Sequence, residues 1–69
     1  MKLYYEIKGE ELNFIIVDSE EKENNLIKNN SVTLLEEDLN GINEAIKVAS
    51  QYAKYYGVFY PNYIKKIIH

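Results

Sequence analysis

The chain has 69 residues, of which 11 are acidic and 8 are basic, so its formal net charge is -3. This length predicts one small domain, residues 1–69, and excludes multidomain enzymes, TIM barrels and two-lobed nucleotide-binding folds. The chain contains no cysteine, which excludes a disulfide-stabilised scaffold and a thiolate metal site.

The N-terminal segment has the pattern of a β-hairpin. Residues 2–8 alternate between polar and apolar side chains, a period of two that is typical of a half-buried strand. Gly9-Glu10 suits a two-residue type II′ turn, because glycine readily adopts a positive φ, and residues 11–18 then form the return strand. This turn places Tyr5 opposite Phe14, a register in which the apolar residues of both strands share one face.

Polar residues dominate the next segment. Residues 18–25 are almost all charged or amide side chains, and they are predicted to form an exposed loop. Apolar side chains return in residues 26–28 and 31–35, two segments that flank Asn29-Asn30. Because asparagine tolerates a positive φ, this arrangement predicts a second tight hairpin.

An amphipathic helix is predicted over residues 39–56, where apolar residues recur at steps of three and four. The recurring residues are Leu39, Ile42, Ile46, Ala49, Ala53 and Tyr56. Asp38 or Asn40 is expected to cap the start of this helix, and Gly57 is expected to end it in the left-handed conformation.

The apolar arc of this helix spans about 200°, whereas an arc of about 100° suffices to cover a small sheet. The excess edge consists of Val48, Tyr52 and Tyr55. We expect the C-terminal segment or another chain to cover it. Residues 58–69 fit either an extended piece and then a short helix from Pro61, or a short strand at Val58-Phe59-Tyr60. We prefer the helix, packed on the excess edge.

Together these elements predict an α+β fold: an antiparallel sheet of three or four strands, beginning with the N-terminal hairpin, covered by one helix and followed by a short C-terminal helix or strand. This arrangement resembles the small partial double-stranded-RNA-binding-like fold of HicB-type antitoxins. The residues concerned are Tyr4-Tyr5 in the first strand and Leu39-Asn40-Gly41-Ile42-Asn43-Glu44-Ala45 at the start of the helix. The chain lacks the Gly- and Pro-containing stretch that those proteins have between the second strand and the helix, so the resemblance concerns architecture and carries over no function.

The chain offers little equipment for catalysis. Its only histidine is His69, and it has neither a cysteine nucleophile nor a glycine-rich phosphate loop. Acidic runs can act as general acids and bases or hold a cation, but the stretch from Asp18 to Glu23 lacks the glycine and the alternating ligands of an EF-hand loop. We therefore expect no enzymatic activity, no metal and no cofactor.

Charge is distributed unevenly along the chain. Residues 1–44 hold all eleven acids and four lysines, a net charge of -7, whereas residues 45–69 hold four lysines and no acid, a net charge of +4. If the acidic runs lie at the same end of the sheet, they form one negative patch that attracts a basic partner. The predicted patch consists of Asp18, Glu20, Glu21, Glu23, Glu36, Glu37 and Asp38.

Five of the seven tyrosines lie in the basic half, interleaved with Lys54, Lys65 and Lys66. Because tyrosine is enriched at protein interfaces, we expect an aromatic edge that contacts a protein partner or a second copy, unless core and tail packing use these residues. The predicted edge consists of Val48, Tyr52, Tyr55, Tyr60 and Tyr63. Tyrosine with lysine can also stack bases and bind phosphates, although four lysines and a negative net charge favour a protein partner over nucleic acid.

The expected function is that of a non-enzymatic protein-interaction module, an inhibitor or regulator that occupies the surface of a partner such as a basic or nucleic-acid-binding host protein. The abundance of Asn, Ile, Lys and Tyr indicates A/T-rich coding. With the small size, it suits a protein of a phage or mobile element directed against a host enzyme or defence system. The alternatives are a nucleotide- or nucleic-acid-sequestering module built on the Tyr/Lys-rich half, and an antitoxin-like regulator.

Location and assembly follow from the same patterns. The longest apolar run, Phe14-Ile15-Ile16-Val17, is far shorter than the ~20 residues that span a bilayer, so we expect a cytoplasmic protein that does not enter a membrane. The aromatic edge predicts a homodimer, with Tyr52 and Tyr55 near its twofold axis.

Overall fold

The N-terminal hairpin is confirmed in the computed structural model, which describes all 69 residues. Strand β1 (Lys2–Lys8) pairs antiparallel with β2 (Glu11–Val17), and Tyr5 lies opposite Phe14 as predicted. Gly9 in the connecting turn has a φ of 63°, a value that residues with a Cβ atom rarely adopt. The turn and the hydrophobic pattern therefore select the same register.

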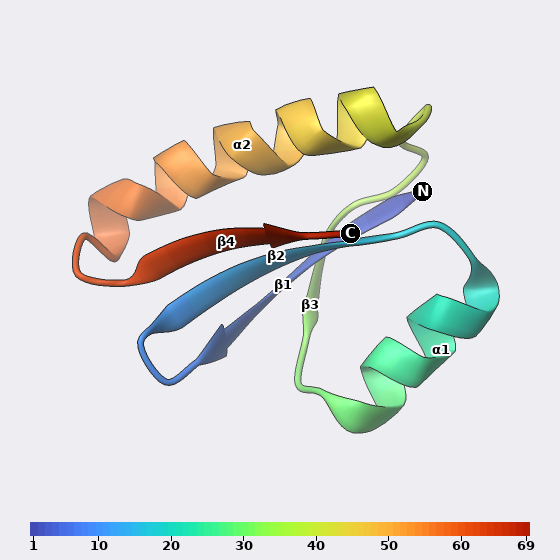
Figure 1. Cartoon of the computed structure of the whole chain (residues 1–69), viewed down its shortest axis with the longest axis horizontal. Coiled ribbons are helices and arrows are strands. Elements are labelled where there is room, and N and C mark those ends of the chain that lie inside the picture. Colours follow the sequence, from blue (N-terminus) through green and yellow to red (C-terminus); the bar gives the residue numbers. More distant parts are fainter.

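A four-stranded mixed sheet is completed by β3 (Thr33–Glu36) and β4 (Ile64–Ile68), in the order β3-β1-β2-β4 (Figure 1). β3 runs antiparallel to β1, whereas β4 runs parallel to β2. The α+β class is confirmed, and the parallel pair corrects the predicted all-antiparallel sheet. The parallel pair arises because helix α2 (Ile42–Phe59) crosses one face of the sheet and returns the chain to the end where β3 began. β4 therefore runs in the same direction as β3 and β2.

Helix α1 (Glu20–Asn29) replaces two predicted elements, the exposed loop over residues 18–25 and the strand over residues 26–28. Asn30 follows this helix with an extended backbone and a φ of -141°, so the predicted tight turn at Asn29-Asn30 is absent. The predictions of the loop, the strand and the turn are therefore wrong. β3 pairs with β1 instead of forming a second hairpin with the residues before it.

α1 forms because its N-terminus is well capped. The hydroxyl of Ser19 accepts a hydrogen bond from the backbone N–H of Lys22 at 3.2 Å. Glu20, Glu21 and Glu23 lie in the first turn, where negative charge stabilises a helix. The helix contains no buried residue, so it lacks the broad apolar stripe by which a helix is usually predicted.

Helix α2 begins and ends three residues later than predicted. Gly41 precedes its first turn with a φ of 119°, and no side chain caps the helix there, so Asp38 and Asn40 do not have the predicted role. Glu44 instead reaches back and accepts a hydrogen bond from the backbone N–H of Asn40 at 2.5 Å. Gly57 stays inside the helix instead of ending it.

Most of the core lies between α2 and the sheet (Figure 1). Its seven buried residues are Leu3, Leu12, Phe14, Ile16, Leu39, Ala45 and Ala49. Both alanines belong to α2 and are completely buried, because their small side chains let the helix backbone approach the strands. On the opposite face, α1 helps to cover a smaller cluster of Tyr4, Ile15 and Val17, packed with Leu26 and Val32.

The C-terminal segment forms β4 and not the predicted helix from Pro61. Val58 and Phe59 belong to α2, so the alternative strand over residues 58–60 is also absent. β4 lies at the opposite edge of the sheet from β3 (Figure 1), and it therefore does not cover the excess edge of α2. Val48 and Tyr52 are instead half-buried against the core, and Tyr55 is exposed. Neither helix combines the length and the apolar character that crossing a membrane requires.

Candidate partner-binding groove

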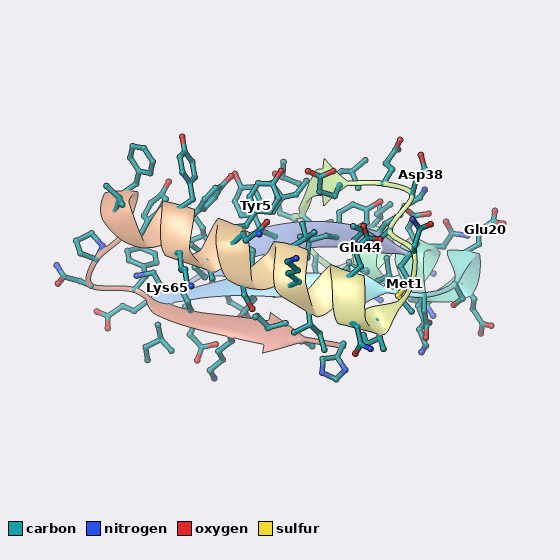
Figure 2. The ribbon with its side chains drawn as sticks, turned by 90° about the horizontal axis from the view of Figure 1, so that it is seen from above. Met1, Tyr5, Glu20, Asp38, Glu44 and Lys65 are labelled. Carbon is teal, nitrogen blue, oxygen red and sulfur yellow. The ribbon has the colours of Figure 1, made fainter.

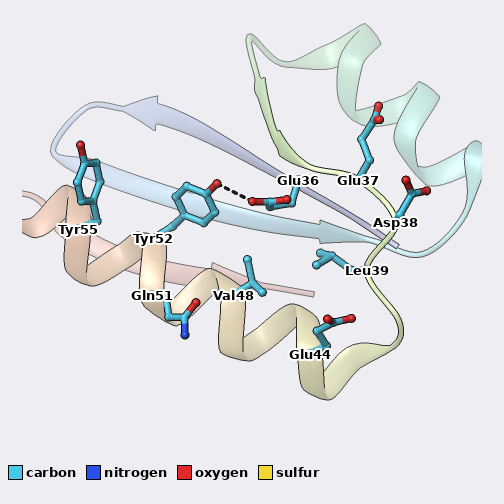
Figure 3. A pocket seen from close by; sticks show the side chains of 9 residues that line it. All are labelled: Glu36, Glu37, Asp38, Leu39, Glu44, Val48, Gln51, Tyr52 and Tyr55. Carbon is cyan, nitrogen blue, oxygen red and sulfur yellow. Dashed lines mark hydrogen bonds between the residues drawn. The ribbon is translucent and has the colours of Figure 1, made fainter.

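A groove runs along the side of α2 that is nearest to β3. α2 packs against β4, β2 and β1, and because it does not extend over β3, the sheet is open beside the helix. The groove has a volume of about 550 Å³ and lies between α2, the end of β3 and the loop that follows (Figure 3). The residues that line it are Glu36, Glu37, Asp38, Leu39, Glu44, Val48, Gln51, Tyr52 and Tyr55.

The loop after β3 is held against the first residue of the chain. Leu39 donates its backbone N–H to the carbonyl of Met1 at 3.0 Å, and the amino group of Met1 donates to the carbonyl of Leu39 at 3.2 Å. Leu39 is buried in the core. Asp38 has a φ of 55°, a left-handed conformation that aspartate tolerates better than most residues. These constraints fix Glu37 and Asp38 at the rim of the groove (Figure 3).

Five residues of α2 form the opposite wall of the groove: Glu44, Val48, Gln51, Tyr52 and Tyr55. The hydroxyl of Tyr52 donates a hydrogen bond to Oε1 of Glu36 at 2.8 Å, and this bond joins the α2 wall to the end of β3 (Figure 3). The hydrogen bond to the carboxylate, together with partial burial, raises the pKa of Tyr52. Tyr55 keeps 59% of its surface exposed and is accessible to a ligand.

Negative charge gathers at the end of the groove formed by the loop and the first turn of α2. Four of the nine lining residues are acidic and none is basic, and none of these four carboxylates takes part in an ion pair. The four are Glu36, Glu37, Asp38 and Glu44. No three His, Cys, Asp or Glu side chains converge closely enough to hold a metal ion. Because these carboxylates do not converge on one point, they suit several cationic side chains better than a single ion.

At its other end the groove meets an aromatic hollow. Tyr55 lines both, and the hollow of about 250 Å³ is completed by Tyr5, Tyr56, Phe59 and Tyr60. The ring centroid of Tyr56 lies 5.1 Å from that of Tyr5 and 5.8 Å from that of Tyr55, and burial raises the pKa of Tyr56. Phe59 is 62% exposed, so the hollow offers apolar area to a ligand.

The two predicted acidic runs line different hollows and do not share one. Residues 36–38 line the groove, whereas Asp18, Glu20 and Glu23 line a separate hollow of about 380 Å³ beside α1. Glu21 is exposed in the first turn of α1. Both runs lie at the C-terminal ends of strands that run in the same direction, β2 and β3, so they are at the same end of the sheet as predicted. The acidic residues of the groove are 36–38 with Glu44, whereas Asp18 precedes α1 and Glu20, Glu21 and Glu23 lie in its first turn.

Two carboxylates of the α1 region already have partners. Asp18 pairs with Lys22 at 3.0 Å, which lowers the pKa of Asp18. Glu23 accepts a hydrogen bond from the phenol of Tyr4 and pairs with Lys2 at 3.0 Å. Both contacts lower the pKa of Glu23, and the bond to Glu23 raises the pKa of Tyr4. Glu23 thereby attaches α1 to β1.

The predicted aromatic edge is also divided. Its α2 part, the excess edge, lines the groove together with the acidic residues 36–38. Tyr60 and Tyr63 lie in the connection between α2 and β4, half-buried, with ring centroids 5.2 Å apart. Both side chains pack against the core, and Tyr60 also lines the aromatic hollow. Lys65 donates hydrogen bonds to the backbone carbonyls of both residues.

Three residues of the groove are missing from the sequence-based prediction: Leu39, Glu44 and Gln51. Glu44, Val48, Gln51 and Tyr55 recur at steps of four, three and four, and this spacing is the signal that places Glu44 and Gln51 on one flank of α2. Leu39 is predicted as the first residue of the helix, whereas it is a buried loop residue beneath the groove.

Comparisons with known protein families, with curated proteins and with solved structures found no match to this chain. What the chain binds must therefore be inferred from the chemistry of the groove itself.

Proposed function

We propose that the chain is a non-enzymatic protein-interaction module that binds a positively charged segment of a partner protein in the groove beside α2. The observation that carries this proposal is the composition of the groove, which has four carboxylates and no basic residue next to exposed aromatic side chains. Occupying a basic surface of the partner makes the chain an inhibitor or regulator of that partner.

The two ends of the groove contribute in different ways. Carboxylates attract a cation before contact and so raise the rate of association. Aromatic side chains exclude water from a large apolar area once contact is made, and they slow dissociation. A partner segment that carries Lys or Arg beside apolar residues is therefore attracted by the carboxylates and then retained by the aromatic side chains.

The positions of the lysines in the C-terminal half favour a protein ligand over a nucleic acid. Lys65 is engaged by backbone carbonyls, and Lys66 pairs with Glu11 at 2.9 Å. Lys47 and Lys54 are exposed on α2 but line neither the groove nor the aromatic hollow. Binding of single-stranded nucleic acid combines stacking on aromatic rings with adjacent positive charge, and the aromatic hollow has no free lysine beside it.

Fluorescence anisotropy with three labelled peptides of equal length tests this proposal. The peptides combine leucine with lysine, with glutamate or with serine, and a labelled oligothymidylate serves as the nucleic-acid probe. We expect only the Lys/Leu peptide to bind at low salt, and we expect its affinity to fall as salt screens the carboxylates. Equal binding of all three peptides, or binding of the oligothymidylate alone, contradicts the proposal.

A further inference from the structure

We infer that the ligand of the groove is an amphipathic α-helix, about four turns long, that lies beside α2 and above β3 with its cationic end at the carboxylates. This inference rests on the proposed function and specifies the form of the ligand. Three features support it: the uncovered part of the sheet, a row of side chains on the flank of α2, and the separation of the acidic end from the aromatic end.

The sheet has room for a second helix on the face that α2 covers. Four strands at a spacing of about 4.8 Å place the outer strands about 14 Å apart, and packed helices lie about 8–10 Å from each other. α2 packs on β4, β2 and β1, and Figure 2 shows Asp38 beyond one flank of α2 and strand β4 beyond the other. A helix packed beside α2 on the Asp38 flank therefore lies above β3, in the groove.

A row of side chains on this flank has the spacing of a helix-packing surface. The row consists of Glu44, Val48, Gln51, Tyr55 and Val58, at steps of four, three, four and three. Such steps align side chains along one side of a helix, where they pack against a neighbouring helix. Tyr55, which lines the groove, is 59% exposed, and Val58, which continues the row beyond the groove, is 77% exposed. The C-terminal part of the row therefore presents apolar area that no other part of the chain covers.

The two ends of the row differ in their chemistry. Glu44 lies at its acidic end, beside residues 36–38, and Tyr55 and Phe59 lie at its aromatic end. At 1.5 Å per residue, α2 rises about 21 Å from Glu44 to Val58. A helix of about 15 residues matches this length. Its lysines or arginines must then lie towards one end, and its apolar residues must face α2 at steps of three and four.

A second copy of the chain matches the groove less well. In a twofold antiparallel pairing of α2 centred on Gln51, Glu44 faces Val58 of the second copy. The lysines of α2, Lys47 and Lys54, do not line the groove, so such a pairing places no cation opposite the carboxylates. The homodimer expected from the sequence leaves the charge of the groove unmatched, whereas a cationic helix complements it.

Two 15-residue peptides with the same leucine, lysine and alanine content test the inference. One has leucines at steps of three and four and lysines towards one end, and the other has the same residues in an order without an apolar face. We expect the amphipathic peptide to bind at least tenfold more tightly, by fluorescence anisotropy, and to gain helix on binding, by circular dichroism. Equal affinity of the two overturns the helical form of the ligand and leaves the proposed function standing, whereas absence of binding by both overturns the two together.

Substitutions locate the binding surface. Tyr55→Ala should weaken binding of the amphipathic peptide about tenfold, because large aromatic side chains dominate interface energies, whereas Ile64→Ala, an exposed site on β4, should leave the affinity unchanged. Equal effects of both substitutions overturn the inference. Light scattering should give a particle of 8.1 kDa, and a dimer that Tyr55→Ala dissociates would show that a second copy occupies the groove instead.

Discussion

The three largest side chains that are completely buried are Leu3, Leu12 and Phe14. Phe14 is the largest of them, and its ring meets that of Tyr56 edge to face, with centroids 5.7 Å apart. Since Tyr56 belongs to α2, this contact joins the hairpin to the helix that forms one wall of the groove. The packing of Phe14 therefore helps to fix the position of the groove.

We expect Phe14→Ala to lower the free energy of unfolding by about 3–5 kcal/mol, because the substitution leaves a cavity at the centre of the core. The core of so small a domain contributes about the same amount, so the variant should be largely unfolded without denaturant. Ile7→Ala is the control, because Ile7 is 45% exposed and should cost clearly less. Urea denaturation followed by circular dichroism measures both, and equal midpoints for the parent and Phe14→Ala would refute the expected packing.

The hydrogen bond from Tyr52 to Glu36 predicts a pH dependence. Because the carboxylate raises the pKa of Tyr52 above its ordinary value of 10.0, the bond stabilises the fold fully below that pH and is lost as the pH rises through the raised pKa. Tyr52→Phe should cost about 0.5–1.5 kcal/mol at neutral pH, and this cost should shrink in more alkaline solution. Urea midpoints measured from neutral to alkaline pH test this, with Tyr55→Phe as a control that removes a hydroxyl without a hydrogen bond. A cost that stays constant with pH would count against the bond.

At the scale of the elements, sequence patterns predict those whose side chains repeat against the core. The hairpin alternates with period two, and α2 carries an apolar arc, so both are recognisable locally. α1 buries no residue, and only Ser19 and the glutamates after it mark its start. β4 depends on pairing with β2, which brings Ile67 opposite Phe14. Such a distant contact is not encoded in local spacing, and Ile64, Ile67 and Ile68 fit one face of a helix equally well.

In the groove, too, some features are visible in the local sequence and others depend on distant contacts. Residues 36–38 and the excess edge can be singled out from the sequence, because a run of acids and an apolar arc that is too wide are visible locally. Their meeting in one groove depends on the position of α2 relative to β3, which is a property of the whole sheet. The contribution of Glu44 becomes apparent only when the exposed flank of α2 is known.

We expect Ser19→Ala to destabilise α1 by about 1 kcal/mol, because it removes the capping hydrogen bond from the N–H of Lys22. Since α1 contains no buried residue, the loss should appear as faster hydrogen exchange of the α1 amides, with a smaller change in global unfolding. Ser31→Ala is the matched control, as Ser31 is exposed and makes no side-chain hydrogen bond. Equal acceleration of exchange throughout the sheet would mean that α1 does not open independently.

At the scale of the whole molecule, ion pairs neutralise three carboxylates, and none of the three lies in the groove. The three pairs are Lys2 with Glu23, Lys22 with Asp18, and Lys66 with Glu11. The carboxylates of the groove have no such partner, and the net charge of -3 adds to their field. This field extends about 10 Å at an ionic strength of about 0.1 M. It should affect the approach of a ligand more than the stability of the fold, because exposed charges contribute little stability.

Neutralising the rim of the groove should therefore slow association. Glu37→Gln with Asp38→Asn removes two charges and keeps the shape, and asparagine tolerates the left-handed backbone at that position. In stopped-flow mixing with the Lys/Leu peptide at low salt, we expect the association rate to fall about three- to tenfold and the dissociation rate to change less. High salt should abolish the difference. Glu20→Gln with Glu21→Gln changes the net charge equally on α1, outside the groove, so equal slowing by this control would attribute steering to net charge and not to the groove.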